Sequence, residues 1–111
     1  MKKNFEIIRG DTLMFTITIE DLEEDLDSCY FSCKKTIDDE TYSFQKLLGN
    51  GIEKLETGKY KIRVAPEDTK SLDVGRYIYD LQIGINEDIY TIMIGTFNIN
   101  KEITEQTYER L

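Results

Sequence analysis

Residues 72–85 constrain the fold of this chain more than any other stretch, and they read Leu-Asp-Val-Gly-Arg-Tyr-Ile-Tyr-Asp-Leu-Gln-Ile-Gly-Ile. The stretch begins with an Asp-x-Gly-x-Tyr element made by Asp73, Gly75 and Tyr77. In antiparallel sandwiches, a tyrosine at such a corner packs its ring under the incoming loop, and its hydroxyl group bonds to backbone upstream. From Tyr77 to Ile85, every second residue is apolar or aromatic. This alternation predicts a central strand with one buried face.

Other segments show the same period of two. In one of them the apolar face holds Leu13, Phe15, Ile17 and Ile19, and the other face holds Thr16, Thr18 and Glu20. In residues 28–37 the alternation places Cys29, Phe31 and Cys33 on one face. Shorter or weaker strands are expected at residues 5–8, 42–48, 52–55 and 59–65. A last long strand is expected at residues 89–99, with a bulge or bend near Gly95.

Residues 66–72 predict one helical turn before the sixth strand. Pro66 stands at its start, where the missing amide is harmless, and Glu67 and Asp68 lie at the positive end of the helix dipole. About seven strands, separated by turn signals and without a long helix, predict an all-β fold, an immunoglobulin-like antiparallel β-sandwich. We expect this sandwich to occupy residues 1–100 and a polar C-terminal tail to occupy residues 101–111.

Two groups of charged residues interrupt the apolar pattern. Residues 20–27 contain six acidic residues but lack the oxygen spacing and central glycine of an EF-hand calcium loop. We expect them to form a solvated hairpin connection with Leu22 or Leu26 packed beneath it. Lys59, Lys61 and Arg63 share the outer face of one expected strand, where they are solvated or pair with an acidic neighbour.

The residue types argue against catalysis and metal binding. The 111 residues include no histidine, which removes the usual Ser-His-Asp and Cys-His arrangements. Cys29 and Cys33 are the two cysteines, and on one strand their Cα atoms would lie about 13 Å apart, beyond the reach of a disulfide. Two thiols without histidine do not complete a zinc site, so buried free thiols are expected. We therefore predict no enzyme activity, no cofactor and no metal.

The net charge of −8 comes from 22 acidic and 14 basic residues. Basic residues provide most of the affinity for phosphates, so this balance argues against nucleic acid and anionic membranes as partners. It leaves open a basic partner, a surface that mimics DNA, or plain solubility. The N-terminus does not resemble a signal peptide, and no apolar run approaches the ~20 residues of a membrane helix. A soluble protein made in the cytoplasm is expected.

The tripeptide Arg9-Gly10-Asp11 is one that integrins recognise in extracellular ligands. A match of three residues arises readily by chance, and a glycine allows the backbone to bend. We interpret the tripeptide as a bend between an edge segment and the next strand.

Several short elements follow one another along residues 5–104 in an order that resembles a known family. They are an Arg-Gly-Asp-Thr opening at residues 9–12, then Tyr60, Ile62, Pro66, Asp68 and Thr69, then Leu72, Gly75, Tyr77, Tyr79 and Asp80, and finally Thr91, Gly95, Phe97, Ile103 and Thr104. This order resembles the small immunoglobulin-like domains of bacteriophage tail and baseplate modules, and is similar to the N-terminal domain of the phage baseplate upper protein family. In that family the domain continues into a longer region, whereas this sequence ends at Leu111, which favours a small stand-alone component.

The resemblance implies a non-enzymatic structural component of a bacteriophage or prophage-derived particle. It would be made in the bacterial host cytoplasm, reside in the virion at the tail, baseplate or neck, and dock onto other phage structural proteins in a symmetric assembly without a small-molecule substrate. Residues 2–8 and 103–111 are expected to contact these partners through Phe5, Ile7, Ile103, Tyr108 and Leu111.

Two other classes of function remain open. One is a binding module that decorates the capsid or faces a cell surface. The other is a small acidic inhibitor of a host protein, acting through residues 21–27 and 86–88, or a decoy of DNA. Immunoglobulin-like folds serve all of these roles.

Overall fold

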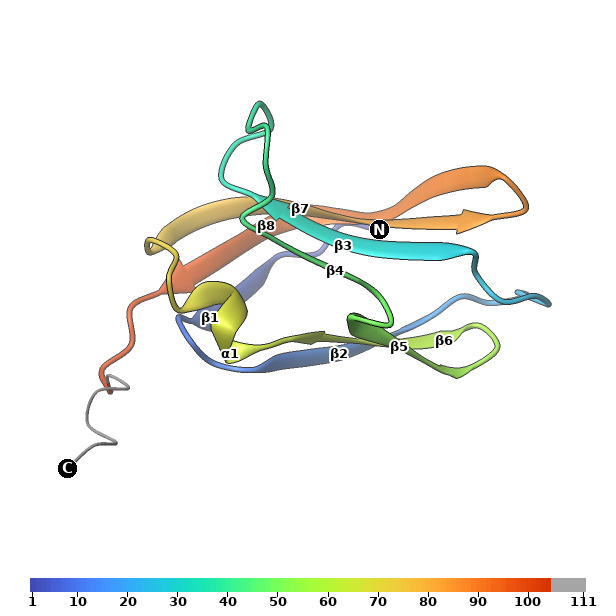
Figure 1. The fold of residues 1–111 in the computed structure, drawn as a ribbon, viewed down its shortest axis with the longest axis horizontal. Helices are drawn as coiled ribbons and strands as arrows, with labels where there is room; N and C mark the ends of the chain where they lie inside the picture. Colours follow the sequence, from blue (N-terminus) through green and yellow to red (C-terminus); the bar gives the residue numbers. More distant parts are fainter. Residues whose placement is uncertain (105–111) are drawn as a thin grey trace.

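The computed structural model describes residues 1–104, which form eight strands and one short helix (Figure 1). The bounds in chain order are β1 Phe5–Ile8, β2 Leu13–Thr18, β3 Ser28–Lys34, β4 Phe44–Leu48, β5 Gly51–Glu56, β6 Lys59–Val64, α1 Pro66–Thr69, β7 Gly75–Ile85 and β8 Asp88–Asn100.

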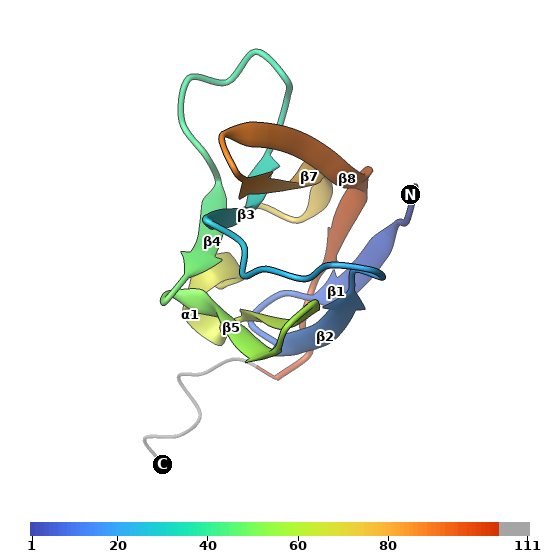
Figure 2. The ribbon, with the colours of Figure 1, turned by 90° about the vertical axis from the view of Figure 1, so that its right-hand side faces the viewer.

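The strands build an immunoglobulin-like β-sandwich of two layers. One layer contains β3, β7 and β8 and the other contains β2, β5 and β6, as Figures 1 and 2 show. The hydrogen-bonded order is β1-β8-β7-β3-β4-β5-β6-β2, so β4 joins the two layers on one side of the sandwich. On the other side, β1 and β2 stand at the two ends of this order, and no backbone ladder connects them.

The predicted all-β sandwich is confirmed, with eight strands in place of about seven. Six strands, β1 to β6, precede α1, so the helix comes before the seventh strand and not the sixth. Two pairings are parallel, β1 with β8 and β4 with β5, and the sheet is therefore not purely antiparallel. Alternation of side chains reports which face of a strand is buried but not the direction of its neighbour.

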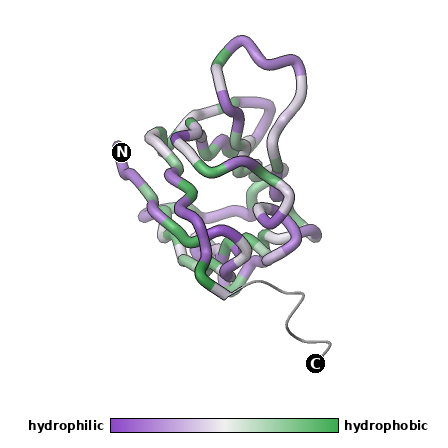
Figure 3. The backbone as a smooth tube through the Cα atoms, turned by 90° about the vertical axis from the view of Figure 1, so that its left-hand side faces the viewer, coloured by the Kyte–Doolittle hydropathy of each residue, from purple (hydrophilic) through white to green (hydrophobic). Residues whose placement is uncertain are grey.

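A raised loop over residues 35–43 connects β3 to β4 (Figure 1). The strand expected at 28–37 ends earlier, at Lys34, because the Asp39 carboxylate accepts hydrogen bonds from the amides of Lys35 and Thr36 and turns the chain. These bonds lower the pKa of Asp39. Ile37 is consequently 78% exposed. Figure 3 shows that most of the raised loop is hydrophilic.

The irregularity expected near Gly95 lies a little earlier in β8. The register with β7 shifts between the pairs Leu81 with Met93 and Gln82 with Thr91, which leaves Ile92 as the extra residue of a bulge. Gly95 itself lies against the N-terminal segment, where a Cβ atom would overlap the carbonyl group of Lys3. A glycine is required there because two backbones approach closely.

Aromatic rings fill the centre of the sandwich around Phe31, which is fully buried. Its ring centroid lies between 5.0 and 6.2 Å from those of five other rings. The five rings come from five different strands and belong to Phe5, Phe15, Phe44, Tyr79 and Phe97. One side chain of β3 thus connects both layers and both edge strands.

Two further expectations about buried groups are confirmed. Cys29 and Cys33 are free and fully buried, and burial raises their pKa values to about 11 and about 12. Leu26 is 7% exposed and packs beneath residues 20–27, where its amide donates a hydrogen bond to the hydroxyl group of Tyr60 at 3.0 Å. The expected hairpin at these residues is wrong, because β2 and β3 do not pair and residues 20–27 cross from one layer to the other.

We predict that Phe31→Ala lowers the free energy of unfolding by about 3–5 kcal/mol, because it removes the ring that the other five contact. Urea unfolding followed by tyrosine fluorescence measures the change. The matched variant Ile37→Ala alters an exposed residue of the raised loop and should stay within about 0.5 kcal/mol of the parent. Equal losses in the two variants would contradict the central role of Phe31.

Candidate functional site

Within residues 1–104, no group of three or more acidic, cysteine or histidine side chains is placed to hold a metal ion. Nor does the same part of the chain contain a helix that is long and apolar enough to span a membrane. The candidate sites of this part of the chain are therefore the surfaces that offer contacts to other molecules.

The Asp-x-Gly-x-Tyr element forms the predicted corner at the start of β7. The Tyr77 hydroxyl group donates to the carbonyl oxygen of Asp73 at 2.8 Å, and the ring is 3% exposed. Gly75 has a φ angle of 144°, which residues other than glycine rarely adopt. The Lys35 ammonium lies 4.6 Å from the centroid of the Tyr77 ring. Burial, with a further contribution from Asp73, raises the pKa of Tyr77. The corner therefore ties the raised loop to the entry of the central strand.

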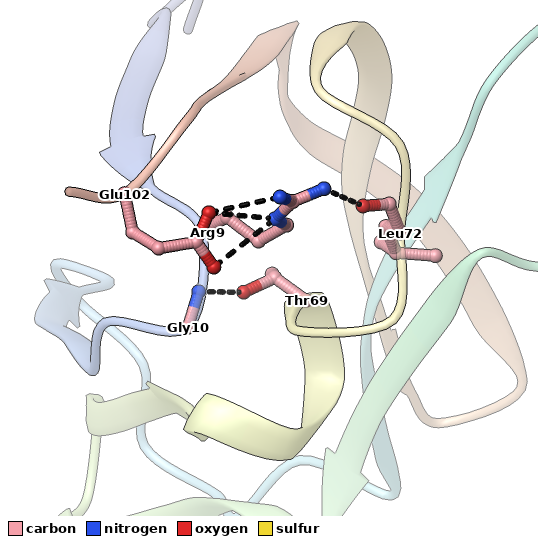
Figure 4. A network of polar contacts seen from close by, with 5 residues as sticks. All are labelled: Arg9, Gly10, Thr69, Leu72 and Glu102. Atoms are coloured by element: carbon pink, nitrogen blue, oxygen red, sulfur yellow. Dashed lines mark hydrogen bonds and ion pairs between the residues drawn. The ribbon is translucent and has the colours of Figure 1, made fainter. Parts of the chain in front are cut away.

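A clasp of five residues, Arg9, Gly10, Thr69, Leu72 and Glu102, closes the same end of the sandwich (Figure 4). The Arg9 guanidinium donates to the Glu102 carboxylate at 2.9 Å from Nη2 and 3.1 Å from Nε, and to the Leu72 carbonyl oxygen at 3.1 Å. The amide of Gly10 donates to the Thr69 hydroxyl group at 2.9 Å. The first two residues of the Arg-Gly-Asp tripeptide therefore make structural hydrogen bonds within the fold.

A partly buried ion pair next to the clasp holds α1 against the sheet. The Lys46 ammonium lies 2.8 Å from the Asp68 carboxylate, and Lys46 is 8% exposed. The same carboxylate accepts the amide hydrogen of Ala65 at 2.7 Å. Asp68 therefore caps the first turn of α1 and anchors β4. The sequence predicted the helical turn through Pro66 and the following acids, but contained no signal for the lysine, which is twenty-two positions earlier.

Most elements of the family resemblance meet at this one end. The residues that contribute to the clasp, the cap of α1 or the corner are Arg9, Gly10, Asp68, Thr69, Leu72 and Tyr77. Their order in the sequence reflects how this end of the sandwich is closed. Glu102 completes the clasp although no local pattern marked it.

The predicted partner residues fall into three groups. Phe5 and Ile7 are 7% and 8% exposed and belong to the core, so the structure corrects their assignment as partner contacts. They are buried because β1 pairs with β8 and turns these two side chains inward. Ile103 is 96% exposed, as a contact residue must be. Tyr108 and Leu111 lie outside the described residues.

The side of the sandwich between β1 and β2 offers a surface that the sequence did not predict; we call it the open side. The rings of Phe5 and Phe15 meet across it at 4.8 Å, so side chains bridge a gap that backbone hydrogen bonds do not. The inward-facing residues of β2 are only half-buried, namely Leu13, Phe15 and Ile17. Met14 is 57% exposed on the other face of the strand.

The edge of β2 lacks the usual features that prevent an edge strand from pairing. Its sequence, Leu-Met-Phe-Thr-Ile-Thr, contains no charge and no proline, and its pairing with β6 is regular over six residue pairs. Natural edge strands usually carry lysine, proline or a bulge that discourages a further strand from adding. An unprotected edge of this kind can accept a strand from a partner.

The charged surfaces agree with the solvated faces that the sequence indicated. Lys61 lies 3.7 Å from Glu53 and Lys59 lies 3.8 Å from Glu56, so two of the three basic residues on the outer face of β6 have acidic neighbours. In the acidic connection, Asp25 pairs with Lys54 at 2.7 Å. These pairs are exposed and contribute little to stability.

Comparisons with known proteins bear on the fold alone. No family model matches the chain, and no curated protein matches it. Among solved structures, 89% of the chain superposes on part of an endo-beta-1,4-mannanase from Thermotoga petrophila, with a TM-score of 0.58 and 13% sequence identity. The chain spans 18% of the length of that enzyme chain. The extracellular domain of the voltage-gated sodium channel beta4 subunit also matches, over 92% of this chain and 93% of its own, with 14% identity and a TM-score of 0.47.

Removing the corner hydroxyl group should weaken the fold modestly. We expect Tyr77→Phe to lower the free energy of unfolding by about 1 kcal/mol, because the Asp73 carbonyl oxygen loses its hydrogen-bond donor. Urea unfolding tests this, with Tyr90→Phe as the control because that ring is 52% exposed. A Tyr77→Phe variant as stable as the parent would show that the corner hydrogen bond is dispensable.

The clasp predicts a stability that depends on pH. Hydrogen bonding from Arg9 lowers the pKa of Glu102 below its ordinary value of 4.5. The clasp therefore contributes stability above pH 4.5 and loses it as the pH falls through the pKa of the folded state. We expect Glu102→Gln to be less stable than the parent at neutral pH and to converge with it in acid.

Unfolding by urea over a series of pH values measures this convergence. The variant Glu40→Gln removes a negative charge from an exposed residue of the raised loop and controls for net charge. A constant difference between Glu102→Gln and the parent at every pH would contradict the assignment of Glu102 to the clasp.

Proposed function

We propose that the chain is a non-enzymatic structural component of a bacteriophage or prophage-derived particle, at the tail, baseplate or neck. It docks onto other structural proteins of the particle through the open side. The resemblance of residues 9–12, 60–69, 72–80 and 91–104 to phage tail and baseplate domains supports the kind of particle. The uncharged, regular edge of β2 is the observation that supports docking.

Docking at the open side has two physical sources of affinity. A strand added to β2 satisfies the backbone groups that face away from β6, in the manner of β-augmentation. The same strand covers the half-buried side chains of Leu13, Phe15 and Ile17. Removing their remaining apolar area from water stabilises the complex. A symmetric assembly presents the same edge from each copy and so repeats the contact.

The start of the C-terminal tail is a second proposed contact. The bond between Arg9 and Glu102 fixes the point at which the chain leaves the sandwich. Ile103 follows directly and is 96% exposed, so a partner can bury an isoleucine that this chain leaves in water. The two contacts lie on the sandwich and on its tail, and they can be removed separately.

The presence of the chain in particles is the first test. Mass spectrometry of purified particles, after induction of the source strain, should find this chain at a fixed ratio to the tail tube protein. Abundant chain in the lysate with none in the particles would contradict the proposal and would favour an inhibitor or a host-directed binding module.

Variants of the open side should separate folding from assembly. We expect Met14→Lys to keep the free energy of unfolding within about 0.5 kcal/mol of the parent, since Met14 is 57% exposed, but to be excluded from particles. Ile89→Lys is the matched control, because Ile89 is 58% exposed at the far end of the β7–β8 hairpin. Normal incorporation of Met14→Lys would rule out docking through β2.

Deletion of residues 103–111, which removes Ile103 together with the rest of the tail, tests the second contact. The core and the clasp are formed by residues 1–102, so the truncated chain should unfold cooperatively. We expect it to fail to enter particles, and assembly of intact particles from the truncated chain would contradict the role of the tail.

A further inference from the structure

A groove of about 850 Å³ crosses the outer face of the layer formed by β3, β7 and β8, on the side away from the core. Its two walls are the N-terminal segment at Lys2 and Asn4 and the raised loop at Ile37 and Tyr42. Figure 2 shows the raised loop standing above the strands of this layer. The groove has the volume of a typical ligand site and uses neither the open side nor the clasp.

The floor of the groove carries three polar side chains in a row among apolar ones. Gln45, Ser32, Asp80 and Ile94 lie side by side on β4, β3, β7 and β8, because each is the register partner of the next. Three strand spacings of about 4.8 Å make this row about 14 Å long. The Gln45 side-chain amide donates to the Ser32 hydroxyl group at 2.9 Å. The three polar side chains of the floor thus present donors and acceptors over two strand spacings, about 10 Å.

Asp80 lies near the middle of this row. Burial raises the pKa of its carboxyl group, and the Lys34 ammonium opposes that effect. Within residues 1–104, its carboxylate receives no hydrogen bond from another group of the chain. A ligand that brings hydroxyl donors would supply hydrogen bonds to this partly buried acceptor.

An aromatic ring completes the rim. Tyr42 is 51% exposed, and the Lys34 ammonium lies 5.4 Å from its ring centroid. Tyr30 adds a second, half-buried ring to the lining. An exposed ring beside fixed polar groups suits a ligand with both an apolar face and polar edges.

We propose that this groove binds an uncharged oligosaccharide. Sugar hydroxyl groups both donate and accept, which matches a floor that combines Asp80, Ser32 and Gln45, while the C–H face of a sugar ring packs against Tyr42. The net charge of −8 disfavours an anionic polymer such as a nucleic acid, and in the groove itself Asp80 offsets one of the two lysines, Lys2 and Lys34. An apolar peptide would bury the carboxylate of Asp80 without supplying a hydrogen-bond donor.

Titration of the ¹⁵N-labelled chain with uncharged hexasaccharides, one of β-1,4-linked glucose and one of β-1,4-linked N-acetylglucosamine, tests the proposal. We expect amide shifts at β3, β7 and residues 37–45 with at least one of them. Tyr42→Ala should weaken that binding about tenfold, and Asp80→Asn should weaken it as well. Tyr90→Ala is the matched control, because Tyr90 is 52% exposed but lies outside the groove.

Three results would overturn the proposal. The first is the absence of amide shifts with both hexasaccharides at about 10 mM, which excludes even weak binding. The second is that Tyr42→Ala and Tyr90→Ala weaken hexasaccharide binding equally. The third is that a single-stranded DNA hexamer binds more tightly than the hexasaccharides at the same residues. Each variant is first checked by urea unfolding, and Tyr42→Phe, which keeps the ring, should retain binding. Particle incorporation of Tyr42→Ala stays normal, so failure of the groove is distinguishable from failure of docking through β2.

Discussion

The packing of five aromatic rings around Phe31 is the interaction on which the rest of this structure depends. Those rings belong to β1, β2, β4, β7 and β8, so one buried side chain of β3 contacts most of the sandwich. Its importance is greatest at the open side, where no backbone ladder joins β1 to β2. There the contact between Phe5 and Phe15 holds the two layers together and leaves the outer edge of β2 without a neighbour among the described strands. The core thus permits an edge that a partner can use.

The parts of the fold that follow from local patterns could be predicted from the sequence. Alternation from Tyr77 to Ile85 predicted the buried face of β7. The Asp-x-Gly-x-Tyr element predicted that the Tyr77 hydroxyl group bonds to upstream backbone, which is the carbonyl oxygen of Asp73. Pro66 and the acids after it gave the single turn of α1. The buried free thiols of Cys29 and Cys33 followed from their spacing on one strand. In each case the determining residues lie within a few positions of one another.

The parts that were missed depend on residues far apart in the chain. Phe5 and Ile7 are core residues because β1 pairs with β8, about ninety positions later, and a four-residue strand carries no sign of that neighbour. The clasp joins Arg9 to Glu102 across a similar separation. The groove is formed where β3, β4, β7 and β8 bring Ser32, Gln45 and Asp80 into one row, which requires the register of three ladders. Such candidate sites are visible only after the strands are placed.

Amide hydrogen exchange of the free chain tests most directly the claim that the open side is uncovered. In β7, which is paired on both sides, the interior amides should exchange slowly. In β2, which is paired only with β6, every second amide points away from its partner strand and should exchange much faster than its neighbours. That alternation along Leu13–Thr18 is the result we predict. Uniform protection of β2, equal to that of β7, would mean that its outer edge is already satisfied and would contradict the account.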